Sequence, residues 1–146
     1  MKLVTFSAGS HEKRVGIMTD SGIIDVRGEN SDAPATMIEL AGLWDKWRGE
    51  FERIARRQPD VQTAKLHAPV PRPGKVLAIG LNYADHIEES GAKTPEHQVW
   101  FCKHVTSVAG PSEDIQMPKV SSALDYEAEM VVVIGKGGRH ISKANA

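Results

Sequence analysis

Three acidic side chains alternate along the chain at Asp125, Glu127 and Glu129, directly before the apolar run Met130–Ile134. Alternate residues of a β-strand point to the same side, so these carboxylates would project together from one face. Like charges at that spacing repel, and burying them is costly unless protons, basic partners or a cation compensate. Hard oxygen donors suit Mg²⁺, Mn²⁺ or Ca²⁺ better than Zn²⁺. The pattern indicates either a divalent-metal site or a solvated, acidic strand end.

A second candidate pair is His86 and Glu89. If the residues after Tyr83 form a helix, these two side chains lie three positions apart on one face, and the carboxylate could orient the imidazole and raise its basicity. Such a pair could activate water, and the alternative is an exposed polar helix with an incidental pair. Lys103, at the end of an expected strand, offers positive charge to an anionic substrate or is simply a solvated strand end.

The part of the chain from Lys75 onward must position these groups. Its pattern predicts a helix at Ala84–Ser90 and strands at Val76–Leu81, Val99–Lys103 and Tyr126–Ile134. Trp100, Phe101 and the lone Cys102 are typical of a buried strand, so we expect a structural thiol rather than a nucleophile.

The first part of the chain predicts a small α+β unit. A strand at Lys2–Phe6 is followed by a hairpin formed by Arg14–Met18 and Gly22–Val26. From Thr36 onward apolar residues recur at spacings of three and four after a capping-box motif, which predicts one amphipathic helix with a bend at Gly49. Its aromatic stripe is expected to pack in the core.

A proline-rich stretch, Leu66–Gly74, forbids regular structure and marks a boundary. The predicted domains are therefore residues 1–70, a small N-terminal α+β domain, and residues 71–146.

Composition restricts the classes of partner. The 18 Lys and Arg residues nearly balance the 19 Asp and Glu residues, so we expect no nucleic-acid partner. No apolar run is long enough for a membrane span, and no signal-peptide pattern opens the chain. We expect a cytoplasmic protein without a membrane partner that binds small molecules or copies of itself. The histidines without ligand spacing are expected at the surface: His11, His67, His97 and His140.

Four blocks together resemble the fumarylacetoacetate hydrolase superfamily, namely Gly74–His86, Phe101–Lys103, Gly110–Pro111 and Leu124–Gly135. The resemblance is close over about residues 72–146 and loose over residues 1–70. It implies that residues 71–146 are the front part of a mixed β-roll, cut short before a third acidic metal ligand, in a fold that is usually dimeric. A homodimer is therefore expected.

The resemblance also implies roles for individual residues. Glu127 and Glu129 would hold Mg²⁺ or Mn²⁺, with Ca²⁺ as the alternative. His86 and Glu89 would form a water-activating dyad, and Lys103 would lie near the substrate.

Members of this superfamily cleave carbon–carbon bonds of acylpyruvates and other β-diketo acids, decarboxylate 2-oxo acids, or isomerise unsaturated diacids. The shared principle is chelation of the substrate carboxylate and 2-oxo oxygen by the metal. The resemblance thus implies a metal-dependent hydrolase or lyase acting on a small 2-oxo or β-diketo acid. The alternative is a non-catalytic interaction or scaffold fragment that needs a partner chain to complete the site.

Overall fold

The computed structural model describes residues 1–9 and 12–146, so the predicted surface position of His11 lies outside the described residues. The chain divides into two compact units, one formed by Met1–Val70 with Ala109–Ala146 and the other by Pro71–Val108. The α+β class is confirmed, with small antiparallel sheets in both units. Within the described ranges, every helix is too short or too polar to cross a bilayer.

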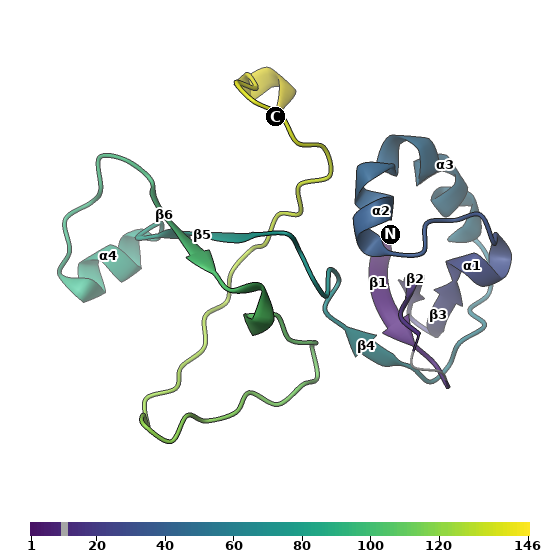
Figure 1. Cartoon of the computed structure of the whole chain (residues 1–146), viewed down its shortest axis with the longest axis horizontal. Helices are drawn as coiled ribbons and strands as arrows, with labels where there is room; N and C mark the ends of the chain where they lie inside the picture. Colours follow the sequence, from purple (N-terminus) through teal and green to yellow (C-terminus); the bar gives the residue numbers. More distant parts are fainter. Residues whose placement is uncertain (10–11) are drawn as a thin grey trace. The chain divides into compact units, whose positions relative to one another are not determined.

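The first unit contains a four-stranded antiparallel sheet with the order β3-β2-β1-β4 (Figure 1). Its strands are β1 (Lys2–Ser7), β2 (Arg14–Thr19), β3 (Gly22–Asp25) and β4 (Lys65–His67). The predicted hairpin is confirmed as β2 and β3. The expectation that regular structure is absent from residue 66 onward is wrong, because Leu66 and His67 precede the first proline of the stretch and pair with β1.

Three helices complete this unit: α1 (Val26–Glu29), α2 (Met37–Gly42) and α3 (Trp44–Ile54). The single helix expected from Thr36 is therefore two helices, and the break lies at Leu43 rather than at Gly49. Leu43 has φ −115° and ψ 15°, outside the helical region, whereas Gly49 lies within α3. A single glycine costs a helix about 1 kcal/mol, which does not by itself end it.

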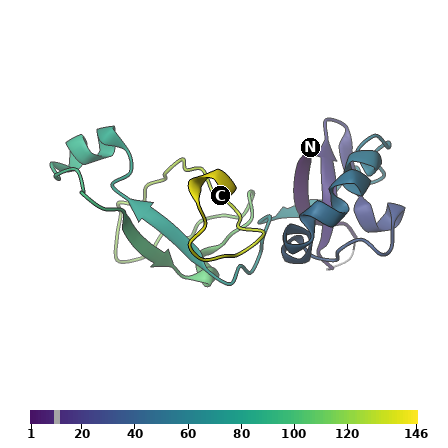
Figure 2. The same cartoon turned by 90° about the horizontal axis from the view of Figure 1, so that it is seen from above.

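The core lies between one face of the sheet and the helices α2 and α3, which Figures 1 and 2 show on the same side of the strands. Its fully buried members include Val15 and Ile24 from the sheet and Leu40, Phe51 and Ile54 from the helices. The expectation that the aromatic stripe packs in the core is confirmed, since Phe51 is fully buried and the half-buried Trp44 meets it edge-on with ring centroids 6.1 Å apart.

The capping box at the start of α2 is present as the sequence predicts. Thr36 Oγ1 accepts a hydrogen bond from the backbone N–H of Glu39 at 3.2 Å, and Glu39 Oε2 accepts one from the N–H of Thr36 at 3.1 Å. Both bonds satisfy backbone donors that a helix start leaves without partners.

Replacing Thr36 by alanine is expected to lower the free energy of unfolding by about 1 kcal/mol, because the N–H of Glu39 loses its acceptor. Urea denaturation followed by tryptophan fluorescence measures the change. Thr63→Ala, at an exposed position outside the helices, is the control. Equal effects of the two substitutions would contradict a stabilising cap.

The second unit is built on a two-stranded antiparallel sheet of β5 (Val76–Gly80) and β6 (Val99–Lys103), joined through α4 (Ala84–Ser90). A short 3₁₀ helix, η1 (Val105–Ser107), follows. The two strands and the helix confirm the elements predicted here. Gly91 caps the C-terminal end of α4, and its φ of 64° is a left-handed conformation that favours glycine.

The predicted burial of β6 is wrong. Trp100 and Phe101 are 55% and 45% exposed, and Cys102 is a free, exposed thiol. A two-stranded sheet can bury a face only against another layer, and the described part of this unit provides none over β6.

The predicted strand at Tyr126–Ile134 is absent from the structure, where these residues form an extended, exposed segment. A strand is defined by backbone hydrogen bonds to a neighbour, and none of the described strands pairs with it. Residues 110–113, which precede this segment, contact β4. Lys65 Nζ lies 3.3 Å from Glu113 Oε1, and Glu113 Oε2 accepts a hydrogen bond from the N–H of Gly110 at 2.9 Å. A second 3₁₀ helix, η2 (Lys143–Asn145), lies near the last residue.

Candidate active site and metal centre

Glu127 and Glu129 lie on the extended segment of the first unit, and both are exposed. Within the described residues neither carboxylate accepts a hydrogen bond or joins an ion pair, whereas Asp125 Oδ1 accepts from the N–H of Tyr126 at 2.8 Å. Both glutamates are therefore free to bind a cation.

The donor set fits a hard divalent ion only in part. Two carboxylates separated by one residue supply the oxygen ligands that Mg²⁺ and Mn²⁺ prefer. These ions take about six ligands, so water, substrate or further protein groups must complete the shell. Across residues 1–9 and 12–146 no group of three or more His, Cys, Asp or Glu side chains is arranged to hold a metal.

His86 and Glu89 lie on α4 in the second unit, three positions apart on the same side of the helix, and both are exposed. The approach to α4 is a sharp turn after β5, in which Leu81 adopts a positive φ of 51°. No hydrogen bond joins the two side chains in the described structure. The helix thus provides the spacing of an acid–base pair, with both groups open to solvent.

Lys103 is the last residue of β6 and pairs in register with Val76. Its Nζ lies 5.8 Å from the centroid of the Phe101 ring, a cation–π distance. The ammonium group forms no ion pair with the described carboxylates, so its charge is available to an anion.

The predicted site residues divide between the two units. His86, Glu89 and Lys103 share the unit Pro71–Val108, and Glu127 and Glu129 share the other. The catalytic, substrate-binding and metal-binding roles of these five residues stay predictions.

A polar pair that the sequence did not predict links β1 to β4. Ser7 Oγ lies 2.9 Å from His67 Nε2, across sixty residues of sequence. The expected surface position of His67 is wrong, because its side chain is half-buried. Burial disfavours the charged imidazole and so lowers the pKa of His67, and the charges of Lys13 and Lys65 lower it further.

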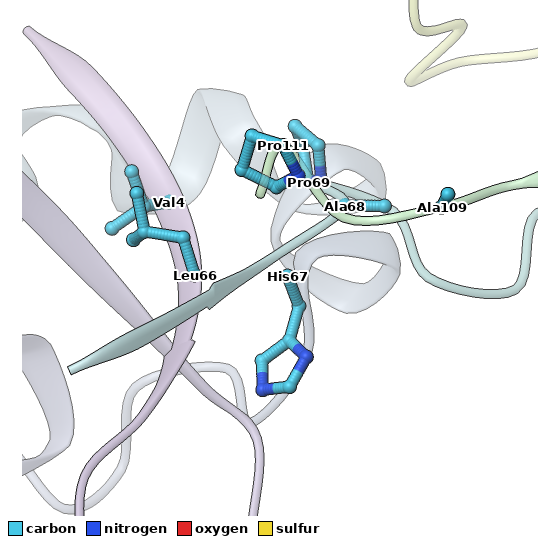
Figure 3. Close-up of a pocket in the computed structure, with 7 residues that line it drawn as sticks. All are labelled: Val4, Leu66, His67, Ala68, Pro69, Ala109 and Pro111. Atoms are coloured by element: carbon cyan, nitrogen blue, oxygen red, sulfur yellow. The ribbon is translucent and has the colours of Figure 1, made fainter. Parts of the chain in front are cut away.

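Among the described residues of the first unit, two hollows stand out, and neither is lined by a predicted site residue. The smaller, of about 230 Å³, is lined by Val4, Leu66, His67, Ala68, Pro69, Ala109 and Pro111. Figure 3 shows the His67 ring pointing away from the side chains of Val4 and Leu66. The larger, of about 390 Å³, is lined by Leu3, Met37, Leu40, Ala41, Trp44, Pro69, Val70, Val133 and Gly135. The walls of both hollows are mostly apolar, which does not suit a charged 2-oxo acid.

Comparison with known proteins connects these residues to a family. Residues 75–146 match the profile of the fumarylacetoacetate (FAA) hydrolase C-terminal family. The chain is 38% identical over 153 residues to the mitochondrial oxaloacetate tautomerase Fahd2a of Rattus norvegicus, an alignment covering 97% of this chain and 47% of that protein.

Solved structures give the same relationship. A crystal structure of a Mycobacterium smegmatis protein provisionally identified as HpcE matches with a TM-score of 0.68 and 34% identity, covering 82% of this chain and 41% of that one. Maleylpyruvate hydrolase from Sphingobium sp. SYK-6, in complex with manganese (II) ion and pyruvate, matches with a TM-score of 0.61 and 25% identity, covering 82% of this chain and 43% of that one.

The chain spans about half the length of the curated relatives it matches. Its relatives include a tautomerase and a hydrolase. The profile match contains all five predicted site residues, and the alignment with the rat enzyme extends over nearly the whole chain. The chain belongs to the fumarylacetoacetate hydrolase superfamily.

Proposed function

We propose that residues 71–146 form the front part of the catalytic domain of a divalent-metal-dependent enzyme that acts on a small 2-oxo or β-diketo acid. Residues 1–70 form a small domain before it, and the catalytic domain is part of a mixed β-roll. The single observation that carries the proposal is the Glu127 and Glu129 pair, which lies within the family match and has no competing partner in the described structure.

The named ligands of relatives support the substrate class. One relative binds manganese and pyruvate, and another is an oxaloacetate tautomerase. Pyruvate and oxaloacetate share a carboxylate next to a 2-oxo group, an arrangement of two oxygens that chelates a hard cation. The proposed reaction is hydrolysis of an acylpyruvate, decarboxylation of a 2-oxo acid or isomerisation of a diacid, for each of which a bound cation would supply Lewis-acid chemistry. A homodimer and a cytoplasmic location stay predictions.

Each residue has a distinct role in this proposal. Glu127 and Glu129 would hold the ion, which when bound would supply Lewis-acid stabilisation of negative charge on the 2-oxo oxygen. His86 Nδ1 or Nε2 accepts a proton from water or from the carbon next to the carbonyl. Glu89 orients the imidazole and stabilises its protonated form, and Lys103 attracts the anionic substrate.

The function is tested with oxaloacetate and an acylpyruvate as substrates. We expect this chain with Mn²⁺ to accelerate enol–keto exchange of oxaloacetate or cleavage of the acylpyruvate above the rate with Mn²⁺ alone, and a chelator to abolish the difference. Ultraviolet absorbance of the enol follows both reactions. Acceleration that survives the chelator, or none with either substrate, would contradict the proposal.

The role of the dyad is tested by Glu89→Gln, which keeps the size of the side chain but removes its charge. We expect a rate lower by about tenfold, equivalent to about 1.4 kcal/mol of transition-state stabilisation. Glu88→Gln removes the same charge at the neighbouring exposed position of α4 and should leave the rate unchanged. Equal losses in both variants would indicate a general charge effect.

A further inference from the structure

A serine and a histidine meet where β1 pairs with the edge strand β4. Ser7 is the last residue of β1 and pairs in register with Lys65. His67 is the last residue of β4 and pairs with Thr5. Ser7 and His67 are therefore diagonal neighbours on one face, because residues two apart in a strand point to the same side. Ser7 Oγ lies 2.9 Å from His67 Nε2, a direct hydrogen-bond distance.

The pair is open to small molecules. Both residues are half-buried, so packing holds each side chain in place and leaves part of it in solvent. Figure 3 shows the His67 ring pointing away from Val4 and Leu66, two residues that line the smaller apolar hollow. The ring therefore does not face those apolar walls, and a substrate can approach it from the surface of the first unit.

The surroundings keep His67 neutral at pH 7. Burial lowers the pKa of the imidazole below its ordinary value of 6.5. The positive charges of Lys13 and Lys65 lower the pKa further, against a smaller opposing effect of Glu113. A neutral imidazole with its proton on Nδ1 accepts a hydrogen bond at Nε2 from the Ser7 hydroxyl. This is the arrangement in which an imidazole can remove the proton of a serine.

We propose that Ser7 is a nucleophile activated by His67, and that the pair hydrolyses small activated esters of carboxylic acids. Ser7 Oγ forms a bond to the carbonyl carbon as its proton passes to His67 Nε2. The bond between the carbonyl carbon and the ester oxygen then breaks, and the leaving alcohol takes the proton from His67. Water attacks the acyl-serine in the same way, which releases the carboxylic acid and restores the Ser7 hydroxyl.

Two lysines supply positive charge where negative charge develops. Attack on the ester leaves an oxyanion on the former carbonyl oxygen. Lys13 and Lys65 act on the imidazole through their charge, so they also stabilise an anion beside it. Lys65 Nζ lies 3.3 Å from Glu113 Oε1, which offsets part of its charge. Exposed lysines stabilise an oxyanion less than fixed backbone donors do, and this restricts the substrates to esters with an acidic leaving group.

This site is separate from the proposed metal centre. It contains none of the five predicted site residues, and its chemistry requires no metal ion. Ser7 and His67 both belong to the unit formed by Met1–Val70 with Ala109–Ala146. The inference can therefore fail or succeed independently of the proposed function.

The first test treats the full chain with a fluorophosphonate probe in the presence of a chelator. Ser7 Oγ forms a bond to phosphorus and fluoride leaves, and tandem mass spectrometry gives the rate of labelling at each serine. We expect Ser7 to react at least about 100-fold faster than the exposed Ser31 of the same unit, because general-base assistance supplies about that factor. Equal rates at the two serines would overturn the inference.

Variants identify the base. His67→Asn keeps a polar side chain but removes the imidazole, and we expect labelling of Ser7 to fall at least about 100-fold. His97→Asn makes the same change at an exposed position and should leave the rate unchanged. Circular dichroism verifies that both variants are folded. Undiminished labelling in folded His67→Asn would overturn the role of His67.

The pH profile of the unmodified sequence is a measurement that needs no variant. Labelling should be level above pH 6.5 and fall at lower pH, because protonation of His67 removes the lone pair that accepts the Ser7 proton. A rate that rises with pH throughout, as for an unassisted hydroxyl, would overturn the inference.

Ester hydrolysis is measured with p-nitrophenyl acetate, again with a chelator, by the absorbance of nitrophenolate. We expect the chain to accelerate hydrolysis, Ser7→Ala to lose the acceleration and Ser31→Ala to retain it. Equal rates for the chain and Ser7→Ala would overturn the proposed hydrolysis.

Discussion

Replacing Glu127 and Glu129 together by glutamine is expected to raise the dissociation constant for Mn²⁺ by at least about 100-fold. Loss of an outer-shell partner of a metal ligand already costs about 10–100-fold in affinity, and here the charged ligands themselves are removed. The amide oxygens that replace them are neutral and weaker donors. Asp125, the third carboxylate of the motif, is unchanged in this variant and accepts a hydrogen bond from the N–H of Tyr126.

Direct observation of the ion is the appropriate measurement. Both glutamates lie on an exposed segment without backbone hydrogen bonds, so the unfolded chain can also bind the ion and the unfolding temperature responds weakly to metal. Electron paramagnetic resonance of free Mn²⁺ gives the bound fraction. Glu96→Gln/Asp114→Asn removes two exposed carboxylates outside the motif and should leave affinity within about twofold, consistent with screened surface charge. Equal weakening in the two double variants would indicate diffuse attraction rather than ligation.

Phe51→Ala is expected to lower the free energy of unfolding of the first unit by about 3–5 kcal/mol. The Phe51 side chain is fully buried, and its ring meets Trp44 edge-on, so alanine leaves a cavity beneath α3. Small domains are stable by only about 5–15 kcal/mol, so this change removes a large share of the total.

Urea denaturation followed by far-ultraviolet circular dichroism measures this effect. Phe101→Ala is the matched control, because this phenylalanine is 45% exposed on β6 and truncation removes far less buried surface. We expect a loss below about 1 kcal/mol for the control. A similar loss at both positions would mean that the core is not centred on Phe51.

The elements that the sequence predicted well depend on local patterns. The β2–β3 hairpin follows from two alternating apolar runs around a short polar turn, and the start of α2 follows from the Thr36 and Glu39 motif. Helix α4 and the strands β5 and β6 were likewise predicted from the residue pattern of short stretches of sequence. In the hairpin and in the helices, residues close in sequence supply most of the hydrogen bonds that define the element, whereas β5 and β6 pair with each other across α4.

The expectations that failed depend on contacts between residues that are distant in sequence. The Ser7 and His67 contact exists only because β1 pairs with β4, and no sequence spacing indicates it. Burial of Trp100 and strand formation at Tyr126–Ile134 both require a further layer or a neighbouring strand. The roles of the predicted site residues depend in the same way on groups that must converge from several segments.

The exposed run Met130–Ile134 also bears on solubility. A short, uncharged, β-branched window is the type of sequence that stacks into intermolecular sheets. Glu127 and Glu129 on one side and Lys136 on the other place charges at its borders, where repulsion opposes such stacking. A cation bound to the two carboxylates would neutralise the charges on one border and weaken this protection, so we expect the chain to aggregate more readily when a divalent ion is present.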